Sequence, residues 1–71
     1  MKLHYYPATD SLYIELSEFS STDSQEVAPG IVLDFDNDGH LVGIDIDHAG
    51  QVVDLSSLEA LGLPLATLRA V

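Results

Sequence analysis

The fold is decided by residues 31–47, which read IVLDFDNDGHLVGIDID. Apolar and polar side chains alternate at period two on both sides of Asp38-Gly39, as is typical of half-buried strands. Asp-Gly is a strong signal for a two-residue type I′ turn, in which both residues take positive φ. The stretch therefore predicts a β-hairpin with its tip at Asp38-Gly39.

The position of this turn sets the register of the hairpin. We expect three apolar cross-strand pairs on one face of the sheet: Phe35 with Val42, Leu33 with Ile44 and Ile31 with Ile46. The other face then carries carboxylates. Because a slip of one residue would move every side chain to the opposite face, the register is well specified.

A second hairpin is expected from residues 3–16, where two β-rich segments flank the turn residues 7–10. Its apolar cross-strand pairs are expected to be Tyr5 with Leu12 and Leu3 with Ile14. Residues 17–26 are polar and rich in Ser, and they predict a loop.

The last third of the chain changes to a helical period. Ser56 and Glu59 have the spacing of a capping box, which predicts the start of a helix. Gly62 and Pro64 predict a break between two short helical pieces. A leucine stripe follows the helical spacing: Leu58, Leu61, Leu65 and Leu68. It either covers the apolar sheet face of its own chain or forms a seam with another copy, giving a homodimer.

These patterns together predict a single α+β domain over residues 1–71. Residues 1–48 are expected to form a four-stranded antiparallel β-meander of two hairpins. Residues 49–71 are expected to supply short helical segments packed on one face.

Composition excludes several classes of protein. The chain has 71 residues, of which 12 are acidic and 2 are basic, so its formal net charge is -10, and it has no Cys. A hydrophobic content of 46% is too high for a disordered acidic tail. Two cations cannot form a phosphate-binding patch, so we expect no nucleic-acid partner. The longest apolar run is three residues and no secretion signal is visible, which favours a cytoplasmic protein without a membrane partner.

The acidic face of the sheet is the candidate partner-binding surface. Its residues are Glu15, Asp34, Asp36, Asp45 and Asp47. One interpretation is a solvated face that keeps the chain soluble. The other is a docking surface for a small basic protein, with charge steering the encounter.

Asp34-x-Asp36-x-Asp38-Gly39 has the spacing of a calcium loop. Such a loop needs flanking helices, whereas both flanks here have strand periodicity. The turn also accounts for Asp38-Gly39 without an ion. We therefore assign no metal site and no cofactor, and keep Asp34, Asp36 and Asp38 as the ligands of an alternative divalent-cation site.

No catalytic residue is predicted. A carboxylate pair would need a pocket that separates the two pKa values, and a domain of this size offers little concavity. The spacing of His4, His40 and His48 does not bring them together, and capping accounts for Ser56. We expect a protein that is not an enzyme.

Three stretches of the chain carry a family resemblance: residues 6–16, YPATDSLYIEL; residues 26–39, EVAPGIVLDFDNDG; and residues 41–46, LVGIDI. In this order and with these gaps they resemble a small bacterial family catalogued as domain of unknown function 2283 (DUF2283). The resemblance covers residues 1–49. Tyr6-Pro7 stands where the family usually has Tyr-Asp-Pro.

The resemblance implies a β-meander with a C-terminal helix, no established activity and no catalytic residues to carry over. Genes of such families often lie beside genes for small basic toxin-like proteins, which implies an antitoxin-like role. We therefore expect an uncharacterised acidic protein–protein interaction module, with divalent-cation binding and a structural homo-oligomer without a ligand as the alternatives.

Overall fold

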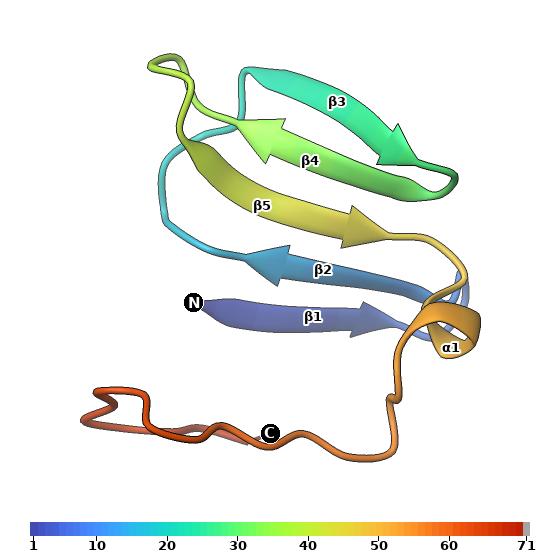
Figure 1. Ribbon diagram of the computed structural model, residues 1–71, viewed down its shortest axis with the longest axis vertical. Helices are drawn as coiled ribbons and strands as arrows, with labels where there is room; N and C mark the ends of the chain where they lie inside the picture. The colour runs from blue at the N-terminus through green and yellow to red at the C-terminus, as the bar shows by residue number, and fades with distance from the viewer. Residues whose placement is uncertain (71) are drawn as a thin grey trace.

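The computed structural model describes residues 1–70, and they form one five-stranded antiparallel sheet followed by a short helix (Figure 1). The elements are β1 (Lys2–Tyr6), β2 (Ser11–Glu15), β3 (Asp23–Ala28), β4 (Ile31–Phe35), β5 (Leu41–Ile46) and α1 (Ala49–Val52). The strand order across the sheet is β1-β2-β5-β4-β3. The expected antiparallel sheet is confirmed, but the number of strands, their order and the C-terminal helices differ from the prediction.

β3 is the strand that the sequence did not reveal. Its first four residues, 23–26, fall in the stretch 17–26 for which a loop was predicted. Its residues from Asp23 to Val27 are exposed. A strand with little apolar surface shows no period-two pattern, and charged side chains are common on sheet edges, where they discourage pairing with other chains. The connection from β2 crosses to the far edge before β3 begins, so the sheet is not a meander (Figure 1).

Four of the five predicted apolar cross-strand pairs are confirmed. The confirmed pairs are Tyr5 with Leu12, Leu3 with Ile14, Leu33 with Ile44 and Ile31 with Ile46. β5 also pairs with β2, which aligns Leu12 with Ile46 and Ile14 with Ile44. These eight residues form two apolar rows across four strands, and we call the side that they occupy the apolar face.

The exception lies at the β4–β5 turn. Phe35 pairs with Leu41 and not with Val42, because the register shifts after Asp34. A type I′ turn would need a positive φ at both Asp38 and Gly39. In this turn only Gly39 has a positive φ, 82°, so the turn is not type I′. The Gly39 N–H donates to the Asp36 carbonyl at 3.1 Å, which makes a type I turn closed by a left-handed glycine. Asp at the first position favours this turn, since its side chain accepts backbone N–H groups.

The core is thin. Leu12 and Ile46 are buried against Ala49 of α1, which is fully buried, and Val42 is buried toward the other end of β5. Asp10, in the β1–β2 turn, attaches α1 to the sheet: its carbonyl accepts the Ala49 N–H at 2.8 Å, and its carboxylate accepts the Gly50 N–H.

Of the helical segments predicted over residues 49–71, only α1 is formed, and the two pieces predicted from Ser56 onward are wrong. Residues 53–70, which we call the C-terminal segment, have no helix or strand and extend beside β1 (Figure 1). Ser56 caps no helix; its N–H and hydroxyl donate to the Asp54 carboxylate. Gly62 and Pro64 divide the segment into pieces shorter than the 12–15 residues that a marginal isolated helix needs. Residue 71, the end of the predicted helical region, lies outside the described residues. Among residues 1–70, no helix is long and apolar enough to cross a membrane.

Candidate partner-binding site

Two rows of polar residues cross the face opposite the apolar face. Because side chains alternate along each strand, directly opposed residues in these rows share that face. One row is Lys2, Glu15, Gly43, Asp34 and Ser24; the next is His4, Tyr13, Asp45, Val32 and Glu26. The sheet thus brings together three of the five predicted acidic-face residues, Glu15, Asp34 and Asp45.

Tyr13 organises the centre of these rows. Its hydroxyl donates to Asp34 Oδ2 at 3.1 Å, and the Ser24 hydroxyl donates to Asp34 Oδ1 at 2.6 Å. The Tyr13 ring reaches across β5 above Gly43, where any Cβ would collide with the Tyr13 hydroxyl. Burial and the hydrogen bond to Asp34 raise the pKa of the Tyr13 phenol, so the group remains a donor near neutral pH.

Asp45 is a partly buried carboxylate with acidic neighbours. Partial burial is the main reason that its pKa is raised, and repulsion from Asp47 and Asp34 raises the pKa further. Within the described residues, no Lys or Arg forms an ion pair with a carboxylate, and the pairs seen involve His: His4 with Glu15 at 3.6 Å and His40 with Asp36 at 3.4 Å. We call Glu15, Asp34, Asp45 and Asp47 the sheet carboxylates.

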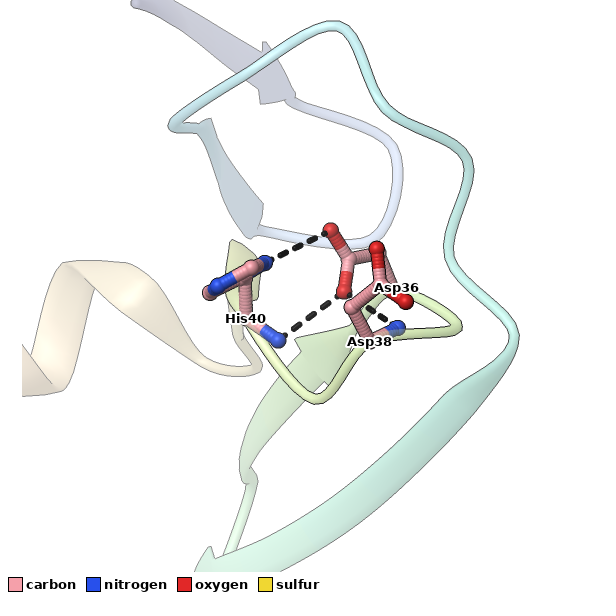
Figure 2. Close-up of side chains that lie close together, drawn as sticks. All are labelled: Asp36, Asp38 and His40. Atoms are coloured by element: carbon pink, nitrogen blue, oxygen red, sulfur yellow. Dashed lines mark hydrogen bonds and ion pairs between the residues drawn. The ribbon is translucent and has the colours of Figure 1, made fainter.

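Asp36, the fifth predicted residue, belongs to the turn. Its Oδ1 accepts the N–H groups of Asp38 and His40, both at 2.9 Å, and its Oδ2 lies 3.4 Å from His40 Nδ1 (Figure 2). The His40 backbone hydrogen bond is the main reason that the pKa of Asp36 is lowered. This carboxylate is therefore already occupied in closing the hairpin.

The structure divides the residues of the predicted calcium loop. Asp36 and Asp38 meet His40, and one ligand atom from each lies within 4.8 Å of the others (Figure 2). Asp34 is bonded to Tyr13 and Ser24 instead. Hydrogen bonds of the turn explain the position of Asp36, so the cluster needs no ion to account for its geometry.

Sequence reasoning missed Tyr13, Ser24 and Gly43 as parts of this site. Gly43 was the available signal, because a glycine within an alternating strand often marks the close approach of another group. Ser24 had no such signal, since its strand was not predicted.

The hollows of the surface lie elsewhere. One is a shallow apolar groove lined by Leu3, Leu12, Val53, Leu55 and Leu58 among others, and a wider one lies between β1 and the end of the C-terminal segment. Neither is lined by Asp34, Asp45 or Asp47. The sheet carboxylates thus form an open charged surface. The expectation that the chain is not an enzyme stays a prediction.

Comparison with known proteins gives one match. A family model described as "Protein of unknown function (DUF2283)" matches residues 2–50, which include all five strands and the start of α1. Neither the curated proteins nor the solved structures contain a significant match to this chain.

Proposed function

The chain belongs to the DUF2283 family of proteins of unknown function, and we propose that it is a small non-enzymatic interaction module whose sheet carboxylates dock a basic protein partner. The family itself assigns no activity. The proposal therefore rests on the charge and geometry of this chain.

The observation that supports it most is the crowding around Asp45. Its carboxyl has a raised pKa because of burial and of the neighbouring Asp47 and Asp34 carboxylates. A Lys or Arg side chain from a partner would relieve that repulsion, as complementary potentials do across interfaces. The Tyr13 ring beside Asp34 adds a surface on which such a cation can rest.

Net charge favours the same class of partner. A formal charge of -10 on 71 residues attracts basic proteins over long distances and repels nucleic acid. A small basic protein encoded by an adjacent gene is the partner that we propose, which makes the role antitoxin-like. The cytoplasmic location expected from the sequence stays a prediction.

Co-expression with the product of the adjacent gene, followed by affinity capture, tests the proposal. In the test variant the four sheet carboxylates become neutral: Glu15→Gln, Asp34→Asn, Asp45→Asn and Asp47→Asn. The control variant makes the same change in charge at exposed positions elsewhere: Glu18→Gln, Asp23→Asn, Asp38→Asn and Glu59→Gln. We expect the test variant to lose at least about tenfold in affinity, worth about 1.4 kcal/mol, while the control keeps most of it. Equal loss in both variants, or no binding by the wild-type chain, contradicts the proposal.

Divalent-cation binding is the second candidate function, favoured by the cluster of Asp36, Asp38 and His40. Calorimetric titration with calcium tests it. Heat at millimolar calcium that disappears in Asp38→Asn supports the site; no heat in the wild-type chain ends it.

A homo-oligomer is the third part of the proposal, with Leu58, Leu61, Leu65 and Leu68 as its seam. This part does not depend on the sheet carboxylates.

A further inference from the structure

We propose that the C-terminal segment of each chain covers the apolar face of a second copy, so that two chains form a dimer by exchanging these segments. The inference deepens the proposed homo-oligomer by naming the surface that receives the leucine seam. It is independent of the proposal for the sheet carboxylates.

The apolar face is the first of two exposed surfaces, although α1 covers Leu12 and Ile46 at one end of it. Leu3 and Tyr5 are 48% and 45% exposed, although they lie in the same rows as the buried core residues. In the β4 and β5 half, Ile31, Leu33 and Ile44 are only half-buried. A contiguous apolar surface of this kind marks a contact site in a folded protein.

The C-terminal segment is the second exposed surface. Every residue from 54 to 70 is exposed, with Leu61 at 84% and Leu68 at 74%. Within residues 1–70, no hydrogen bond joins residues 54–70 to the sheet. The segment therefore presents most of its apolar side chains to solvent, while at its start Leu55 and Leu58 line a groove with Leu3 of its own chain.

Charge selects these two surfaces as the ones that meet. Residues 55–70 contain one acid, Glu59, and one base, Arg69, so this part is neutral while the rest of the chain carries the whole net charge of -10. The rows of the apolar face contain no charged side chain on β1, β2, β4 or β5. Two copies of a strongly acidic chain repel each other through their other surfaces, but the neutral residues 55–70 and the apolar face approach without that cost.

The path of the segment points to a second copy as the recipient. Its start, near Val53 and Leu55, borders the β1 and β2 end of its own apolar face. Beyond residue 58 it follows β1 at the sheet edge (Figure 1), and the hollow there is lined by residues 1–4 and by the segment. On the β4 and β5 half of its own face, α1 covers Ile46, but neither hollow beside the segment includes a β4 or β5 residue, and Ile31 and Leu33 stay half-buried. A two-fold axis would place the partner's segment there and the first chain's segment on the partner.

The size of the contact fits a stable dimer. Specific interfaces use about 20–30 residues a side. The apolar face and residues 54–70 together reach that range.

Light scattering after size exclusion tests the dimer with the full chain. We expect a mass of twice 7.6 kDa for the wild type. The variant with Leu58, Leu61, Leu65 and Leu68 changed to Ser should be monomeric at the same concentration, its dissociation constant raised at least about 100-fold. The control Phe19→Ser removes an exposed apolar side chain from the β2–β3 connection and should stay dimeric. Circular dichroism confirms that each variant keeps its sheet.

Cross-linking tests the exchange itself, using the absence of native Cys. Chains carrying Leu33→Cys are mixed with chains carrying Leu61→Cys and oxidised. A disulfide-linked heterodimer is expected; mixing with Phe19→Cys instead of Leu61→Cys should give little.

A monomeric wild type overturns the proposal, and so does a dimer that is indifferent to the four leucine changes. The variant with neutral sheet carboxylates should remain dimeric, which separates failure of this inference from failure of partner docking.

Discussion

The sheet with α1, residues 1–52, and the C-terminal segment, residues 53–70, are both rich in apolar side chains, yet only the first is folded. In the sheet, Ile44 has Ile14 on one side and Leu33 on the other, each supplied by a different strand. In the segment, Leu61 has no such neighbours and is 84% exposed. Apolar content therefore folds this chain only where hydrogen-bonded strands hold the side chains in rows.

The largest expected effect comes from removing a core side chain on the folded side of this comparison. Ile46→Ala should lower the free energy of unfolding by about 2–4 kcal/mol, since Ile46 is buried between Leu12 and Ala49. Leu61→Ala, measured in dilute solution, should change it by less than about 0.5 kcal/mol. Urea denaturation measures both. Similar losses in the two variants would mean that the C-terminal segment belongs to the folded core.

Two glycines sharpen the same contrast, because both have positive φ and open space around them. Gly39, at 82°, lies in the β4–β5 turn, and Gly62, at 75°, lies in the C-terminal segment. Gly39→Ala should cost about 1–2 kcal/mol of stability, since an alanine is strained in the left-handed region. Gly62→Ala should leave the thermal unfolding of the sheet unchanged. A cost at both positions would show that the two regions unfold together.

Tyr13→Phe should have a smaller effect, about 0.5–1.5 kcal/mol, because it removes the hydrogen bond to Asp34 and leaves the ring in place. Gly43→Ala should instead displace the ring, which lies where the new Cβ would be. Spectrophotometric titration of tyrosine distinguishes them: in Gly43→Ala the raised pKa of Tyr13 should return toward 10.0. An unchanged titration would mean that the ring does not depend on Gly43.

Asp45→Asn should have the smallest effect, an increase in stability within about 0.5 kcal/mol at neutral pH. Since burial and the neighbouring carboxylates raise the pKa of Asp45 in the fold, the folded chain binds this proton more tightly than the unfolded chain. Its contribution is therefore favourable at low pH and is lost as the pH rises from about 3.8 through the folded pKa. The variant should remove this dependence from a series of denaturation curves against pH.

Asp36→Asn should change the dependence of stability on pH in the direction opposite to Asp45→Asn. Backbone hydrogen bonds lower the pKa of Asp36, so its contribution is present above 3.8 and is lost as the pH falls through the folded pKa. If both variants changed the pH profile in the same direction, the assigned causes of the two shifts would be wrong.

Strand pairs within a hairpin were predictable from the sequence, whereas pairs between strands far apart in the chain were not. The sequence predicted the cross-strand pairs of Ile31 with Ile46 and of Leu3 with Ile14, because the turn residues and the alternation that determine a hairpin lie close together in the chain. The pairing of β2 with β5 was not predicted, since no local signal joins Leu12 to Ile46. β3 was hidden by its polar sequence, and the leucine spacing predicted helices that have no partner surface within the chain.

Part of the candidate site was predictable for the same reason. Alternation placed Glu15, Asp34 and Asp45 on one face without knowledge of strand order. The roles of Ser24 and Tyr13 required contacts between strands far apart in the chain. Asp36 was assigned to the face because its parity is right, whereas the turn geometry directs its carboxylate to backbone N–H groups.

β5, at the centre of the sheet although it is the last strand of the chain, has a consequence for biosynthesis. The β1–β2 and β3–β4 hairpins do not pair with each other and are joined only through β5. A nascent chain on the ribosome thus holds two separate hairpins, each marginal alone, until residues 41–46 have left the exit tunnel. Completion of the sheet therefore waits until β5 has been made, and a chain interrupted before Leu41 exposes two strand edges that the finished protein conceals.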